Sequence, residues 1–81
     1  MYIHLGGEKV IRYSELIAIF DIAVDEHSKI TKQFLSRIEE NRQLERVSEE
    51  EPKSLVVTDH KVYYSPISAA TLKKRAQFVF Q

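Results

Sequence analysis

The stretch from Leu55 to Arg75, LVVTDHKVYYSPISAATLKKR, constrains the fold of this chain more than any other part of the sequence. Strand-forming residues stand on both sides of a polar break at residues 59–61, which predicts a β-hairpin. Ser65-Pro66 ends the second strand, because proline has no N–H to donate to a ladder. Ser68 is a suitable N-cap for a short helix that follows, so a hairpin and a basic helix are predicted in close succession.

The N-terminal part of the chain predicts a second hairpin followed by a buried strand. Met1 to Leu5 and Lys9 to Arg12 have extended character, and Gly6-Gly7 between them predicts a turn. A glycine pair also occurs in phosphate-binding loops, but the chain has neither GxGxxG nor GK[ST], so the hairpin turn is favoured. Leu16 to Ala23, LIAIFDIA, is the most apolar run and predicts a central strand that is buried on both faces.

One amphipathic helix is predicted over about residues 28–40, because apolar residues recur at i, i+4, i+5 and i+8 from Ile30. The polar stretch 41–53, with three glutamates before a proline, predicts a loop or a short turn. A short C-terminal helix is predicted over about residues 69–77. These elements indicate an α+β fold, with a small antiparallel or mixed β-sheet and one main helix, in a single domain over residues 1–81.

Four features of the sequence favour self-association. A chain of 81 residues buries only roughly 60–65% of the surface that its unfolded form exposes, so an isolated subunit should be marginally stable. There is no cysteine, which excludes disulfides and thiolate metal sites as stabilising elements. The apolar segment Phe78-Val79-Phe80 could be covered by a neighbouring copy. The formal charge is −4 in residues 1–51 and +4 in residues 52–81, a split that suits head-to-tail contact between copies.

No combination of residues predicts a reaction. His4, His27 and His60 lie far apart without HxH or HxxxH spacing, so no metal site is expected. Asp21, near the end of the apolar run, is interpreted as a strand-end residue that meets solvent or a backbone N–H rather than as a catalytic carboxylate. The sequence shows neither a signal segment nor an apolar run of membrane length. We therefore expect a non-enzymatic, cytoplasmic protein without cofactors, metals or membrane contact.

Three segments carry a resemblance to a known family: MYIHLGGEKVI, LIAIFDI and PKSLVVTDHKVYYSPISAATLKKRAQF. In this order and spacing they resemble the extracellular matrix regulatory protein family, and they are more similar to its RemB branch than to RemA. The resemblance implies a small α+β subunit that assembles into closed homo-oligomeric rings. It also implies a bacterial cytoplasmic regulator of biofilm-matrix genes, with RemA-like members binding DNA through arginines arrayed around the ring.

At three positions where RemA-like members carry arginine, this chain carries Glu15, Glu50 and Glu51. Acidic groups at these positions repel DNA phosphates, so DNA binding through that face is not expected. Basic residues remain immediately before the strand that begins near Leu55 and at the end of the last helix. The predicted nucleic-acid-binding residues are therefore Lys53, Lys73, Lys74 and Arg75.

Two functions stay open on this evidence. The first is a DNA-binding transcriptional regulator that uses a basic surface repeated by the symmetry of a ring and formed by Lys53, Lys61, Lys73, Lys74 and Arg75. The second is a ring-forming interaction partner of a RemA-like paralogue, with little direct DNA binding. For the cluster Lys73-Lys74-Arg75, the structural alternative is ordinary positive charge at a helix C-terminus.

Overall fold

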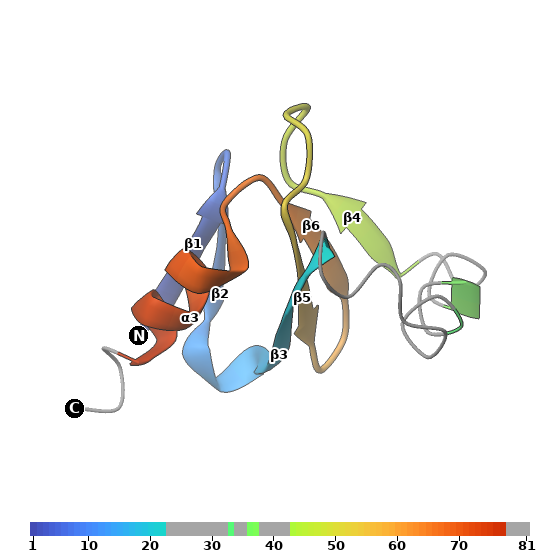
Figure 1. Ribbon diagram of the computed structural model, residues 1–81. Helices are drawn as coiled ribbons and strands as arrows, with labels where there is room; N and C mark the ends of the chain where they lie inside the picture. The colour runs from blue at the N-terminus through green and yellow to red at the C-terminus, as the bar shows by residue number, and fades with distance from the viewer. Residues whose placement is uncertain (23–32, 34–35, 38–42, 78–81) are drawn as a thin grey trace.

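The computed structural model describes residues 1–22, 33, 36–37 and 43–77. They form two β-sheets and a C-terminal helix, which confirms the predicted α+β class (Figure 1). The helix predicted over residues 28–40 lies mostly outside the described residues, but Gln33, Ser36 and Arg37 within it are helical. The segment Phe78-Val79-Phe80 lies outside them altogether.

The first sheet is the predicted N-terminal hairpin. β1 (Tyr2–Gly6) pairs antiparallel with β2 (Lys9–Arg12), and both glycines of the turn have positive φ, 109° at Gly6 and 56° at Gly7. A Cβ added at Gly6 would lie 2.9 Å from Cγ of Pro66, and one at Gly7 would lie 2.5 Å from the carbonyl oxygen of Val47. The turn therefore requires glycine both for its backbone conformation and for its close approach to neighbouring segments.

The second sheet contains four strands in the order β3-β5-β6-β4. The predicted central hairpin is confirmed: β5 (Ser54–Thr58) pairs antiparallel with β6 (Val62–Ser65). β3 (Leu16–Asp21) follows β2 through the 3₁₀ turn η1 (Tyr13–Glu15) and pairs antiparallel with β5. β4 (Leu44–Arg46) pairs parallel with β6.

The prediction that the apolar run from Leu16 forms a central strand is wrong. β3 lies at one edge of the sheet in the part of the chain that the structure describes, and none of its residues is fully buried. Ile17 is 65% exposed. All five residues of β5 are buried, so β5 occupies the centre instead. The run is apolar because both faces of β3 pack partly on the core, Ile19 on one side of the sheet and Phe20 on the other.

A strand was missed in the stretch predicted as a loop. β4 has only three residues, two of them charged, so it gives no clear period in the sequence. It is held against β6 by hydrogen bonds that continue beyond its ends. The Val62 N–H donates to the Gln43 carbonyl at 2.9 Å, and the Val47 N–H donates to the Tyr64 carbonyl at 3.2 Å.

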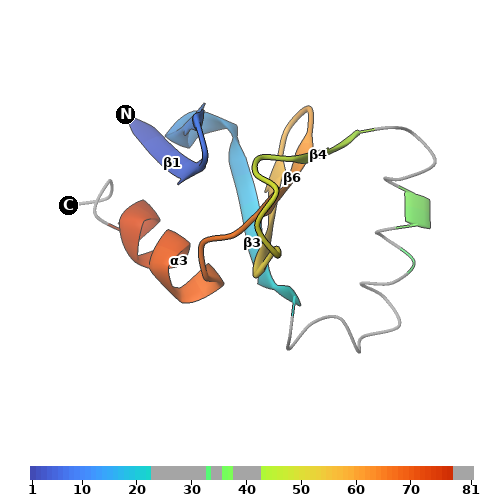
Figure 2. The ribbon, with the colours of Figure 1, turned by 90° about the horizontal axis from the view of Figure 1, so that it is seen from above.

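The helix α3 (Ala69–Gln77) agrees with the predicted C-terminal helix. Ser68 caps it as predicted, because the Thr71 N–H donates to Ser68 Oγ at 3.2 Å. α3 packs against β1 and β3, and Leu72 on its inner side is fully buried. Figures 1 and 2 show α3 and the β1–β2 hairpin side by side, on the same side of the four-stranded sheet.

The main core fills the space between the hairpin, one face of the four-stranded sheet and α3. Its buried side chains are Ile3, Leu5, Ile11, Val56, Tyr63 and Leu72. A second, smaller cluster lies on the other face of the sheet and contains Leu55, Val57 and Val62. Burial of each large apolar side chain contributes about 1.5–3 kcal/mol to the free energy of folding. The main core, with six buried side chains against three, therefore contributes more than the second cluster.

Two buried serines connect the two sheets. Ser54 and Ser65 face each other across β5 and β6, and neither side chain is exposed. Ser65 Oγ donates to the carbonyl of Leu5 in β1 and accepts from the N–H of Ile67 at 3.1 Å. Ser54 Oγ donates to the carbonyl of Ile67 at 2.8 Å. These bonds fix the hairpin and the segment before α3 to the end of the β5–β6 pair.

Candidate nucleic-acid interface

The basic residues of α3 lie on its outer side. Lys73, Lys74 and Arg75 are exposed, whereas Leu72 beside them is fully buried in the core. The sequence of α3, AATLKKRAQ, contains no acidic residue, so no carboxylate of the same helix neutralises these cations. Lys74 and Arg75 lie in the last turn, where a positive charge also interacts favourably with the helix dipole. The structure thus brings together three of the four predicted site residues.

Arg75 also has a structural contact. Its Nη1 donates to the backbone carbonyl of His4 at 2.9 Å, which fixes the C-terminal half of α3 to β1. A guanidinium group has five N–H donors, so this one hydrogen bond does not exhaust its capacity for an anion. Arg75 therefore connects the basic helix to the N-terminal hairpin.

Lys53 lies beside the other end of α3. Its side chain is exposed, and its backbone N–H donates to the carbonyl of Ser65 at 2.8 Å. The next residue, Ser54, is bonded to Ile67 just before α3 begins. At about 1.5 Å per residue, the basic residues of α3 lie roughly 6–9 Å further along the helix axis. Lys53 therefore lies near the start of α3, whereas the three basic residues of the helix lie towards its end.

The three glutamates at the family's arginine positions come from different parts of the fold. Glu50 and Glu51 are exposed in the segment between β4 and β5, shortly before Lys53. Glu15 is half-buried in η1, and its carbonyl accepts from the N–H of Asp59 at 3.1 Å, in the turn between β5 and β6. Carboxylates are thus present near both ends of β5.

A charge cluster that the sequence did not reveal joins β2, β4 and the β5–β6 turn. Glu45 Oε1 lies 3.0 Å from Nζ of Lys61, and Glu45 Oε2 lies 3.8 Å from Nζ of Lys9. The hydrogen bond to Glu45, and then its negative charge, raise the pKa of Lys61 above its ordinary value. Lys9 Nζ also lies 4.8 Å from the centre of the Tyr63 ring. Glu45 partly neutralises both lysines, so this cluster is a weaker attractant for phosphates than the helix cations.

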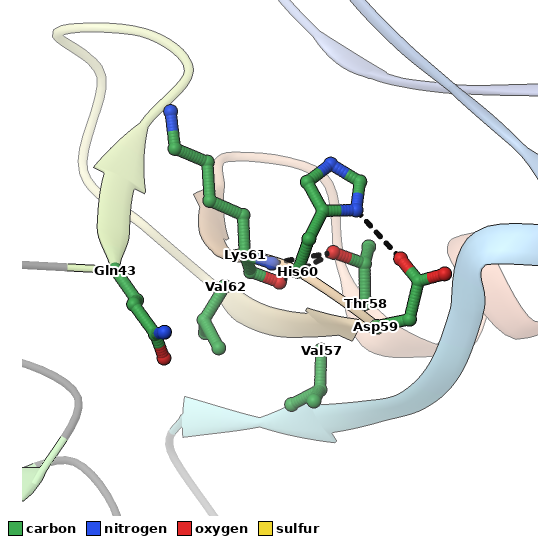
Figure 3. Close-up of a pocket in the computed structure, with 7 residues that line it drawn as sticks. All are labelled: Gln43, Val57, Thr58, Asp59, His60, Lys61 and Val62. Carbon is green, nitrogen blue, oxygen red and sulfur yellow. Dashed lines mark hydrogen bonds and ion pairs between the residues drawn. The ribbon is translucent and has the colours of Figure 1, made fainter.

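A hollow of about 210 Å³ lies beside the β5–β6 turn (Figure 3). Within it, His60 Nδ1 and Asp59 Oδ1 are 2.6 Å apart, but 56% and 62% of their side chains are exposed. Thr58 Oγ1 donates to the carbonyl of Lys61 and accepts from its N–H at 3.0 Å, so this hydroxyl stabilises the turn. Because the His–Asp pair is solvated and the hydroxyl is already engaged, the geometry is that of a hairpin turn rather than of a nucleophile and its base.

Among the described residues, no three or more His, Cys, Asp or Glu side chains are grouped so that they would hold a metal ion. No helix in the same part of the chain is long and apolar enough to cross a membrane. Asp21 is half-buried at the end of β3, as predicted for a strand-end residue.

Comparison with known proteins gives a match over nearly the whole chain. Residues 2–76 match the family described as RemA-like, extracellular matrix regulatory protein A-like. The chain is also 43% identical over 81 residues to extracellular matrix regulatory protein B of Bacillus subtilis (strain 168). That alignment covers 100% of this chain and 96% of the relative. These matches confirm the resemblance inferred from the three sequence segments.

Proposed function

Because this chain belongs to the RemA-like family of extracellular matrix regulatory proteins, we propose that it is a non-enzymatic bacterial regulator of biofilm-matrix genes. In this proposal it acts in the cytoplasm as a homo-oligomeric, ring-like transcriptional regulator that binds duplex DNA. The observation that carries the DNA-binding part is the exposed cluster Lys73, Lys74 and Arg75 on a helix without acidic residues.

A ring would give this small cluster enough binding strength. Three cations on one subunit make few phosphate contacts, and each contact releases counterions from the DNA. Repetition of the cluster around a ring makes the later contacts intramolecular, which can raise avidity by about 10²–10⁴ without any new kind of contact. Affinity should therefore fall steeply with salt, with a log–log slope of about −0.9 for each phosphate contacted.

Self-association is supported by the size of the chain and by the edge of its larger sheet. With 81 residues and no cysteine, the subunit has a small core and no disulfide. β3 is an edge strand among the described strands, and the side chain of its residue Ile17 is 65% exposed. An edge strand presents unpaired backbone groups to another chain, and a repeated head-to-tail contact closes into a ring when the rotation permits.

The proposal is tested by measuring molecular mass and DNA affinity on the same preparation. Light scattering at micromolar concentration should give a mass several times the 9.5 kDa of one chain. Titration of labelled duplex DNA at about 50 and 200 mM salt should show a steep loss of affinity. The variant Lys73→Gln/Lys74→Gln should flatten the salt dependence and keep the mass, because both side chains are exposed. A monomeric wild-type protein contradicts the ring, and absence of binding at about 50 mM salt contradicts the DNA-binding role.

A second candidate function is a ring-forming partner of a RemA-like paralogue, with little direct DNA binding. The exposed Glu50 and Glu51 favour it, because they place negative charge next to Lys53. In this case the titration would show no binding by the protein alone, whereas mixing with a purified RemA-like paralogue would give a complex of higher mass in light scattering.

A further inference from the structure

The outer face of the N-terminal hairpin carries an exposed pair of an aromatic residue and an arginine. Side chains alternate along β1 and β2, so Ile3 and Ile11 are buried while Tyr2 and Arg12 are exposed, Tyr2 by 68%. The register places Tyr2 directly opposite Arg12. Side chains in such cross-strand pairs have Cβ atoms about 4.5–5.5 Å apart. An exposed tyrosine and an exposed arginine are thus cross-strand neighbours on the outer face of the hairpin.

This pair lies close to the contact that joins the hairpin to α3. His4, whose carbonyl accepts from Arg75, pairs with Val10 in the register, and Arg12 is two residues further along β2. Diagonal neighbours of this kind are about 7–8 Å apart. Figures 1 and 2 both show the hairpin and α3 together at the end of the molecule away from β4. Arg12 therefore belongs to the same end of the molecule as the helix cations.

The elements that form this end contain no carboxylate. The sequences of β1, β2 and α3 are YIHLG, KVIR and AATLKKRAQ. Glu8 lies in the turn at the far end of the hairpin, roughly 13 Å from Arg12 at about 3.3 Å per residue. Glu15 lies three residues after Arg12, in η1, and is half-buried, so one carboxylate follows Arg12 closely in the chain. The side chains of β1, β2 and α3 therefore carry five Lys and Arg charges and no carboxylate, a net positive charge that attracts phosphates.

Lys53 has a different electrostatic environment. It follows Glu50 and Glu51, both exposed, within three residues of the chain. Two exposed carboxylates so near in the chain oppose the attraction between Lys53 and a phosphate, because they weaken the local positive potential. Lys53 thus follows two exposed carboxylates, whereas Arg12 has one half-buried carboxylate at a similar separation in the chain, so Arg12 is better placed than Lys53 to meet DNA that lies against the helix.

We infer that Arg12, with Tyr2 beside it, completes the DNA-contacting surface of Lys73, Lys74 and Arg75, and that Lys53 does not belong to this surface. The inference rests on the DNA-binding function proposed above. Arginine suits this role, because its planar guanidinium can donate two parallel hydrogen bonds to one phosphate. Tyr2 contributes by packing its ring on the sugar or donating its hydroxyl to a phosphate, contacts that position the duplex without reading its sequence.

Two matched variants test the inference, since Arg12→Gln and Lys53→Gln each remove one exposed positive charge. Binding of a fluorescently labelled duplex is followed by anisotropy at about 50, 100 and 200 mM salt, with light scattering and circular dichroism on the same samples. Arg12→Gln should lower affinity about tenfold and reduce the salt slope by about 0.9 for each subunit in contact with DNA. Lys53→Gln should change affinity less than about twofold.

Two further variants separate charge from packing. Tyr2→Ala should lower affinity without changing the salt slope, and Arg12→Lys should retain the slope of the wild type.

The outcomes separate this inference from the function on which it rests. If Arg12→Gln binds like the wild type, or Lys53→Gln loses as much affinity, the inference is wrong, while loss of binding in Lys73→Gln/Lys74→Gln keeps the DNA-binding function. If Arg12→Gln changes the mass in light scattering, Arg12 is an assembly residue and the inference is again wrong. If the wild-type protein binds no duplex at about 50 mM salt, the proposed function fails and the inference with it. Tighter binding to a single strand than to the duplex would also overturn it.

Discussion

Replacement of Ser65 by alanine removes the hydroxyl that joins the N-terminal hairpin to the four-stranded sheet. Ser65 Oγ donates to the carbonyl of Leu5 and accepts from the N–H of Ile67. Ser65 is 0% exposed and Leu5 is 1% exposed, so water cannot replace the lost hydroxyl without a rearrangement. The variant therefore leaves one backbone acceptor and one backbone donor without their partner.

The size of the effect follows from these two groups. A buried polar group left unsatisfied costs about 1–3 kcal/mol, so we expect a loss of about 2–4 kcal/mol in the free energy of unfolding. Stability of roughly 0.05–0.15 kcal/mol per residue gives about 4–12 kcal/mol for a chain of this length. Because 1 kcal/mol shifts Tm by about 4–8 °C in a domain of this size, Tm should fall by at least about 8 °C.

Thermal and urea denaturation followed by circular dichroism measure this loss. Protein concentration must be held constant, because assembly makes Tm depend on concentration. Ser14→Ala is the matched control: it removes the same hydroxyl from an exposed position in η1 and should change stability by less than about 0.5 kcal/mol. If the Tm of Ser65→Ala lay within about 2 °C of the Tm of Ser14→Ala, the two hydrogen bonds of Ser65 would not stabilise the contact between the hairpin and the sheet.

Three other predictions concern the turn, the charge cluster and the sheet edge. Gly7→Ala should destabilise the protein by at least about 2 kcal/mol in urea denaturation, because it combines a left-handed backbone with a Cβ only 2.5 Å from the Val47 carbonyl oxygen; a wild-type midpoint would contradict this. Glu45→Gln should lower the pKa of Lys61 measured by NMR, since Glu45 raises it. The contribution of Lys61 protonation should accordingly stabilise the fold at neutral pH and be lost as pH rises above the ordinary lysine value of 10.5, through the raised pKa of Lys61. Ile17→Asp should reduce the mass in light scattering but not the content of secondary structure; an unchanged mass would exclude the β3 edge from the assembly contact.

Those parts of the fold that depend on local chemistry could be predicted from the sequence. The turn at Gly6-Gly7 follows from the freedom of glycine at positive φ, and the start of α3 follows from the capping hydroxyl of Ser68. The position of β3 could not be predicted in the same way. An apolar run indicates that both faces of a strand pack, as they do at Ile19 and Phe20, but it does not say whether the strand has one neighbour or two.

Features that depend on distant pairing were missed. β4 exists because Leu44–Arg46 lies along β6, and three residues with two charges give no pattern by themselves. Ser65 was interpreted only as the end of a strand. Its role as a connector appears only once β1 is placed beside β6, because its acceptor, Leu5, lies 60 residues away in the chain.

The candidate site shows the same limit. Lys73, Lys74 and Arg75 are neighbours in sequence, and a helix keeps them together. Lys53 was grouped with them because the family resemblance implies a basic residue immediately before β5, and the fold places it beside the opposite end of the helix. Arg12 was overlooked, because its closeness to α3 depends on the strand register and on the hydrogen bond from Arg75 to His4.

The hairpin also links stability to the proposed DNA binding. Its inner face is fixed by Ser65, its turn packs against Val47, and its β1 strand is bonded to Arg75, so the spacing between Arg12 and the basic residues of α3 is set by the core. Multivalent binding depends on such spacing, because a contact that must first be ordered contributes less to affinity. Ser65→Ala should therefore weaken duplex binding although Ser65 is buried and too far inside to touch DNA. The measurement is anisotropy at a temperature well below the Tm of the variant, with Ser14→Ala as the control. Equal affinities of the two variants would show that the position of the hairpin does not matter for DNA binding.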